Sequence, residues 1–78
     1  MMNKQDQKRG WYGKYIIEKA DGSQIDVGAE YFVLRIDKDP AARIAARAYA
    51  EAVKDTAPLL ARDIIQKCSY YDEGYFHQ

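Results

Sequence analysis

The sequence predicts an α+β fold, in which a small antiparallel β-meander of two or three strands precedes two α-helices that pack on one of its faces. Three observations predict it: a first half rich in aromatic and β-branched residues, a turn signal at Asp21-Gly22, and an Ala-rich run that begins after Asp39-Pro40. The chain has 78 residues, enough for one small domain. We expect a flexible polar arm over residues 1–10, a single domain over 11–68 and a Tyr-rich tail over 69–78.

The predicted strands lie in the first half. Residues 11–19 read WYGKYIIEK, a composition that favours a strand, and Asp21-Gly22 follows with the tolerance for positive φ angles that a tight hairpin turn requires. A short run over 23–28 alternates apolar and polar residues before the strongest strand, EYFVLRI. Because side chains alternate along a strand, one face of this last strand is expected to pack on the helices through Phe32, Leu34 and Ile36.

The first predicted helix runs from Pro40 to about Lys54. The Asp39 carboxylate is placed to accept from the amides of the first turn, and Pro40 suits the first helical position. Arg43, Arg47 and Glu51 are expected on the outer face, with Arg47 and Glu51 as an i,i+4 pair. The buried face is expected to consist of apolar residues at steps of three and four, namely Ala41, Ile44, Ala45, Ala48, Ala52 and Val53.

A second helix is predicted after Pro58, which disfavours helical geometry in the residue before it. Thr56 is the expected N-cap and Pro58 the first-turn residue. Its apolar stripe is expected to contain Leu60, Ala61, Ile64, Ile65 and Cys68.

Composition and charge exclude several classes of protein. Twelve basic and twelve acidic residues give a net charge of zero, and the sequence contains no apolar run of the roughly 20 residues that a membrane helix needs. The polar start does not resemble a secretory signal, and the single Cys68 cannot form an internal disulfide. We therefore expect a cytoplasmic protein without a metal or cofactor.

Residues for catalysis are scarce. The single histidine, His77, is next to the C-terminus, and the two serines, Ser23 and Ser69, lie outside the predicted elements, so no nucleophile and base can be paired. Asp37 and Asp39 form one paired-carboxylate arrangement that could bind a metal, but a helix cap explains Asp39 better. No catalytic residue is predicted, and we expect that the protein is not an enzyme.

Aromatic residues near the N-terminus give an alternative function. Trp11, Tyr12 and Tyr15 lie near Lys8, Arg9 and Lys14, an arrangement that resembles a base-stacking platform with phosphate contacts. The basic excess is small and interrupted by acidic residues, which disfavours nucleic acid as a partner. Half-buried strand aromatics are the preferred interpretation, and a small ligand- or nucleic-acid-binding module is the alternative.

Exposed aromatics also predict an interaction surface. A sheet with helices on one face leaves its other face uncovered, and an uncovered apolar patch typically marks an interface. We expect that face to carry Tyr12, Tyr15, Tyr31 and Val33, and to pair with a second copy in a homodimer or with a host protein. The tail supplies a possible docking segment with Tyr70, Tyr71, Tyr75 and Phe76.

Residues 14–53 resemble a family of small bacterial and phage-borne proteins to which no function is assigned. The shared pattern is Lys14-Tyr15, Glu18-Lys19 and Asp21-Gly22, then Ala29 to Arg35, Asp37, Asp39-Pro40 and Ala48-Tyr49-Ala50. The resemblance implies an accessory gene on a phage or other mobile element, and it implies no catalytic residues. The function predicted is a non-catalytic accessory protein that acts by protein-protein contact, such as a phage-type modulator of a host complex.

Overall fold

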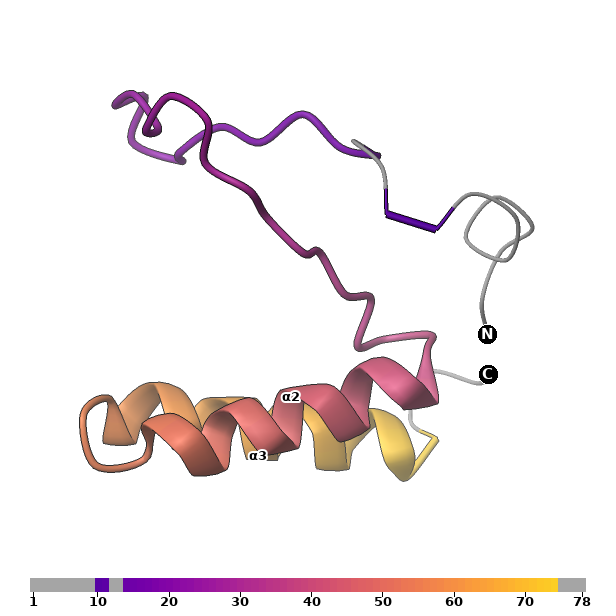
Figure 1. Ribbon diagram of the computed structural model, residues 1–78. Helices are drawn as coiled ribbons and strands as arrows, with labels where there is room; N and C mark the ends of the chain where they lie inside the picture. The colour runs from indigo at the N-terminus through magenta and orange to yellow at the C-terminus, as the bar shows by residue number, and fades with distance from the viewer. Residues whose placement is uncertain (1–9, 12–13, 75–78) are drawn as a thin grey trace. The chain divides into compact units, whose positions relative to one another are not determined.

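The computed structural model of the protein describes residues 10–11 and 14–74. The described residues contain two α-helices, α2 (Pro40–Val53) and α3 (Pro58–Asp72), which lie side by side and run antiparallel (Figure 1). No residue of the described part is in a strand. The α+β prediction is therefore wrong, and the described part of the chain is all-α.

Residues 10–33 form one unit of the chain, and a second unit begins at Leu34. In the first unit the chain turns at Asp21-Gly22, as predicted, and the Gly22 amide donates to the Lys19 carbonyl at 3.0 Å. Gly22 has a φ of 81°, which only glycine adopts without strain. A second turn follows, in which the Ala29 amide donates to the Asp26 carbonyl at 3.1 Å. The described residues on either side of these turns form no ladder, because a two-stranded hairpin has little stability of its own in water.

The helical unit starts at a side-chain cap. Asp39 is the N-cap of α2, the position predicted for it, and its carboxylate accepts from the Ala41 amide at 2.9 Å. The N-cap of α3 is Ala57, which makes no side-chain cap bond. The prediction of Thr56 as the cap is wrong, because the Thr56 hydroxyl donates back to the Val53 carbonyl at 3.3 Å. Thr56 thus completes the end of α2 and leaves the start of α3 to Pro58.

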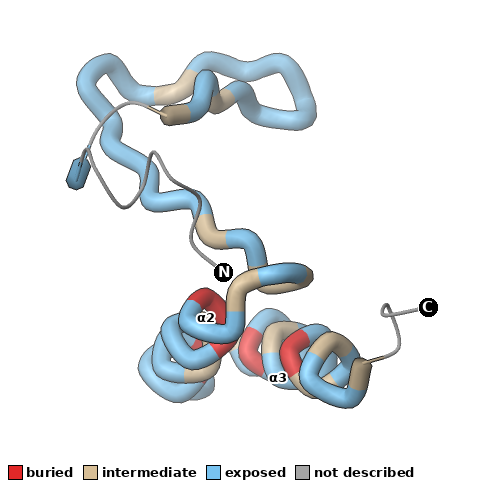
Figure 2. Tube along the Cα trace, turned by 90° about the vertical axis from the view of Figure 1, so that its right-hand side faces the viewer, coloured by how far each residue is buried: buried red, intermediate tan, exposed pale blue. Residues whose placement is uncertain are grey.

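Small side chains form the contact between the helices. The buried apolar residues of the described chain are Ala42 and Ala50 from α2, with Ala61 and Cys68 from α3. Figure 2 shows the buried positions of the two helices facing each other. Because alanine has only a methyl group, the two backbones can approach closely.

The buried face of α2 differs from the predicted one. Ile44 was expected inside and its side chain is 71% exposed, whereas Arg43 was expected outside and is 8% exposed. Ala41, Ala45, Ala48 and Ala52 are also exposed. An Ala-rich helix carries apolar residues on more than one side, so the spacing alone does not choose the buried one. The contact of Arg43 with α3, described below, decides it.

The end of α3 lies beyond the predicted boundary. The helix continues through Ser69, Tyr70, Tyr71 and Asp72, residues that were expected to belong to the tail. The Glu73 amide donates to the Ser69 carbonyl at 3.0 Å, and Gly74 then has a φ of 82°. A glycine in this left-handed conformation is a common helix terminator, so Gly74 is the stop signal.

Neither of the two described helices is both long enough and apolar enough to span a membrane.

Candidate interaction surface

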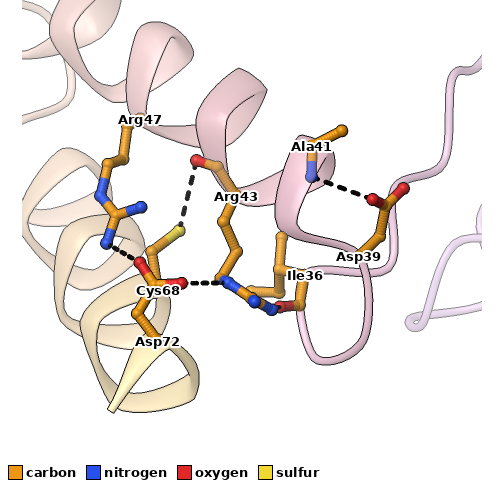
Figure 3. Close-up of polar contacts among 7 residues, drawn as sticks. All are labelled: Ile36, Asp39, Ala41, Arg43, Arg47, Cys68 and Asp72. Carbon is orange, nitrogen blue, oxygen red and sulfur yellow. Dashed lines mark hydrogen bonds and ion pairs between the residues drawn. The ribbon is translucent and has the colours of Figure 1, made fainter. Parts of the chain in front are cut away.

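Two arginines of α2 form ion pairs with one carboxylate of α3. The Arg43 Nε donates to Asp72 Oδ1 at 2.5 Å, and the Arg47 Nη2 donates to Asp72 Oδ2 at 2.6 Å. Arg43 also donates from Nη1 to the Ile36 carbonyl at 2.6 Å. Figure 3 shows the Asp72 carboxylate lying between the two guanidinium groups. This cluster joins the start of α2, the end of α3 and the segment that leads into α2.

Charge pairing explains the burial of Arg43 and the acidity of Asp72. The guanidinium of Arg43 is almost fully buried and has partners at two of its nitrogens, so the burial leaves no unpaired charge. The hydrogen bond from Arg47, and then that from Arg43, holds the pKa of Asp72 below its usual value. Arg47 was expected to pair with Glu51, but Glu51 pairs with Lys54 at 2.6 Å instead. The cluster is a structural clamp between the helices.

Cys68 lies behind this clamp. Its side chain is fully buried, and its Sγ lies 3.9 Å from the Arg43 carbonyl (Figure 3). A thiol is a weak donor, so this contact is mainly one of packing. Cys68 therefore acts as a small apolar core residue.

The two carboxylates before α2, Asp37 and Asp39, have different hydrogen-bond partners. Asp37 accepts from Arg35 at 3.1 Å and 2.6 Å, and this bond lowers the pKa of Asp37. Asp39 caps α2. Among the described residues, no group of three or more histidine, cysteine or acidic side chains is placed to hold a metal ion. The geometry gives both carboxylates structural partners.

The aromatic residues of the first unit are exposed but do not lie on a sheet. Trp11 contacts Phe32 with ring centroids 5.5 Å apart, and the Lys14 ammonium lies 5.5 Å from the Tyr15 ring centroid. Tyr15 and Tyr31 are each 46% exposed and Val33 is 41% exposed. Phe32, expected to face the helices, is 71% exposed. The sheet face expected to carry them is absent from the described residues, and Tyr12 lies outside those residues.

The predicted C-terminal docking residues divide between two parts of the chain. Tyr70 and Tyr71 belong to the last turn of α3, and their rings meet edge to face with centroids 5.4 Å apart. Tyr75, Phe76 and His77 lie outside the described residues. Ser69, expected outside the regular elements, is half-buried within α3.

The helical hairpin has an exposed surface that the sequence analysis did not identify as such. At 100° per residue, Ala45, Tyr49 and Ala52 lie on the flank of α2 away from Arg43 and Arg47. By the same geometry, Leu60 and Ile64 lie on the flank of α3 away from Asp72. The clamp therefore marks one side of the hairpin, and the opposite side carries these apolar residues, with Lys67 one heptad after Leu60. We call this opposite surface the apolar side; it consists of Ala45, Tyr49, Ala52, Leu60 and Ile64.

Solvent exposure supports this description of the apolar side. Tyr49 is 54% exposed and Leu60 is 48% exposed, while Ile64 is half-buried. The two alanines of the surface, Ala45 and Ala52, are exposed. A sequence signal for this surface exists in α2. Besides the stripe of Ala42, Ala46 and Ala50, the helix has a second apolar stripe at steps of four and three residues, formed by Ala45, Tyr49 and Ala52.

No protein-family model, curated protein or solved structure matches this chain.

Proposed function

We propose that the protein is a non-catalytic binding module that acts by protein-protein contact through the apolar side of its helical hairpin. The observation that carries this proposal is the exposure of Tyr49 and Leu60 on the apolar side of the two packed helices. Apolar surface of this kind is removed from water when a protein partner binds. Tyrosine is also enriched at such interfaces, because its ring is apolar and its hydroxyl tolerates water.

The polar groups of the described helical unit support binding over catalysis. Asp72 is held by two arginines, Asp39 caps a helix and Asp37 is paired with Arg35. Each carboxylate thus has a structural partner that accounts for its position. The role of an accessory protein that modulates a larger complex fits a module of this size.

A photo-crosslinking experiment tests the proposal. Benzoylphenylalanine replaces Ala45 on the apolar side, or Glu51 on the outer face of the same helix as the matched control. We expect a defined covalent protein adduct from position 45 and none from position 51, in cells that produce the protein. Adducts of equal yield at both positions, or none at either, would overturn the proposal.

Binding of nucleic acid is the competing function and has its own test. The proposal leads us to expect no salt-dependent binding of a single-stranded oligonucleotide, measured by fluorescence anisotropy over a salt series. If Trp11 and Tyr15 stacked on bases beside phosphate-binding lysines, affinity would be measurable at low salt and would fall steeply as salt is added. Loss of such binding in Trp11→Ala would establish the competing function.

A further inference from the structure

One stretch of the described chain has a backbone without hydrogen-bond partners in the protein. Among the described residues, residues 30–34 make no backbone hydrogen bond, although they lie between two hydrogen-bonded turns. On the N-terminal side the Ala29 amide donates to the Asp26 carbonyl at 3.1 Å, and on the C-terminal side the Asp39 amide donates to the Arg35 carbonyl at 3.0 Å. We call residues 30–34 the open segment. Figure 1 shows it as plain chain before α2.

The side chains of the open segment are also accessible. Tyr31 is 46% exposed and Phe32 is 71% exposed. The Phe32 ring contacts that of Trp11 with centroids 5.5 Å apart, yet most of its surface remains in water. An endoprotease binds an extended chain through its backbone and places one side chain in a specificity pocket. The open segment offers both features, an unpaired backbone and exposed aromatic side chains.

We infer that the open segment is a cleavage site for endoproteases with a deep apolar specificity pocket, and that one cut there releases the helical hairpin in its folded form. The bond that is cut follows Tyr31 or Phe32. Hydrolysis breaks the C–N bond of that peptide group. Water supplies the hydroxyl of the new carboxyl group and the hydrogen that the new amino group gains, so no other reactant is consumed.

The contacts that hold the hairpin lie on one side of this cut. Arg43 donates to the Ile36 carbonyl at 2.6 Å and to the Asp72 carboxylate at 2.5 Å. The cap bond joins Asp39 to Ala41. All of these residues belong to the second unit of the chain, which begins just after the cut. The apolar side lies in the same unit, so the cut neither removes the proposed binding surface nor depends on it.

Tyr49 provides an internal comparison that isolates the effect of the backbone. Its side chain is 54% exposed, slightly more than that of Tyr31, but its peptide bond lies within α2. Because the residue type is the same, the specificity pocket does not distinguish the two sites. A protease reaches the bond in α2 only when the helix opens, so the rate of cutting there depends on the population of the open form. Cutting after Tyr31 or Phe32 should therefore be at least about tenfold faster than cutting after Tyr49.

Limited proteolysis of the full chain by chymotrypsin tests the inference, with mass spectrometry to identify the ends of each product. We expect early products that end at Tyr31 or Phe32, well before any that end at Tyr49. The C-terminal product, once purified, should keep the helical circular dichroism signal of α2 and α3. Cutting after Tyr49 at a comparable rate, or loss of the helical signal in that product, would overturn the inference.

A double variant tests the role of the aromatic side chains. Tyr31→Thr combined with Phe32→Thr leaves the backbone open and removes the groups that fill the pocket, so cutting at these two positions should slow at least about tenfold. Tyr49→Thr is the matched control and should leave cutting in the open segment unchanged. Both variants should keep the helical signal of the wild type, because the replaced side chains are largely exposed. Cutting at positions 31 and 32 of the double variant at the wild-type rate would rule out the specificity that we infer.

Discussion

Asp39 shows how much one residue before a helix can indicate. Its position before Pro40 predicts an N-cap, and the structure places its carboxylate 2.9 Å from the Ala41 amide. The same local chemistry does not extend to Thr56, since Ala57 takes the N-cap position of α3 and the Thr56 hydroxyl turns back to α2. The Asp39 carboxylate can only accept, so it bonds to a helix amide, whereas the Thr56 hydroxyl can also donate to a carbonyl of the preceding helix. A cap is therefore easier to predict for aspartate than for threonine at such a junction.

Replacing Asp39 by alanine should lower the free energy of unfolding by about 1 kcal/mol, the usual value of an N-cap bond. Chemical denaturation measures this change. Asp55→Ala is the control, because Asp55 is exposed beyond the end of α2 and should change stability by less than about 0.5 kcal/mol. EDTA should leave the melting temperature unchanged if Asp39 is a cap; a lower melting temperature would indicate a metal site instead.

Because of Asp72, the stability of the helical unit should decrease at low pH. Its hydrogen bonds to Arg47 and Arg43 depress its folded-state pKa below the ordinary value of 3.8. The stabilisation is therefore fully present above that ordinary value and is lost as the pH falls through the lower folded-state pKa. Circular dichroism melts at decreasing pH should show this loss in the wild type and less of it in Asp72→Asn. Asp63→Asn is the control, and an equal flattening in that variant would contradict the clamp.

At the scale of the elements, the sequence predicts both helices and part of the buried face of α3, where Ala61 and Cys68 are buried as expected but Leu60 and Ile65 are exposed. It does not predict the buried face of α2. The start of α2, its length and the Pro58 start of α3 follow from local signals, and these agree with the structure. The buried face of α2 does not follow from local signals, because alanines occupy two sides of the helix. Only the pairing of Arg43 and Arg47 with Asp72 selects the side that faces α3. That pairing joins residues 25 to 29 positions apart and leaves no local pattern.

Two substitutions in α2 distinguish the observed face from the predicted one. Ile44→Ala should change the free energy of unfolding by less than about 0.5 kcal/mol, since Ile44 is 71% exposed. Ala50→Leu should cost about 1 to 3 kcal/mol, because Ala50 is 2% exposed in the contact with α3 and the larger side chain does not fit. Urea denaturation of both variants is the measurement. A large loss in Ile44→Ala with a neutral Ala50→Leu would restore the predicted face.

At the scale of the molecule, strand-like composition did not produce a sheet within residues 10–11 and 14–74. Residues 30–36 have the residue types of a strand, yet a strand also needs a neighbour that supplies hydrogen bonds along its length. Propensity is a local property and pairing is not, so the α+β prediction extended a local signal beyond what it determines. The turns at Gly22 and Ala29, by contrast, need only a few consecutive residues, and they form.

Hydrogen exchange should show this difference along the whole chain. Amides in the middle of α2 and α3 have helical hydrogen bonds and should exchange slowly, with protection that reports the opening of the hairpin. Between residues 14 and 33, protection should be confined to turn amides such as those of Gly22, Ser23 and Ala29, which donate to nearby oxygens. NMR-detected exchange on the full chain resolves each amide. Protection at alternate residues across 14–19 and 29–36 would reveal a paired hairpin and contradict the all-α description, whereas fast exchange there leaves the two helices as the stable framework on which the apolar side is built.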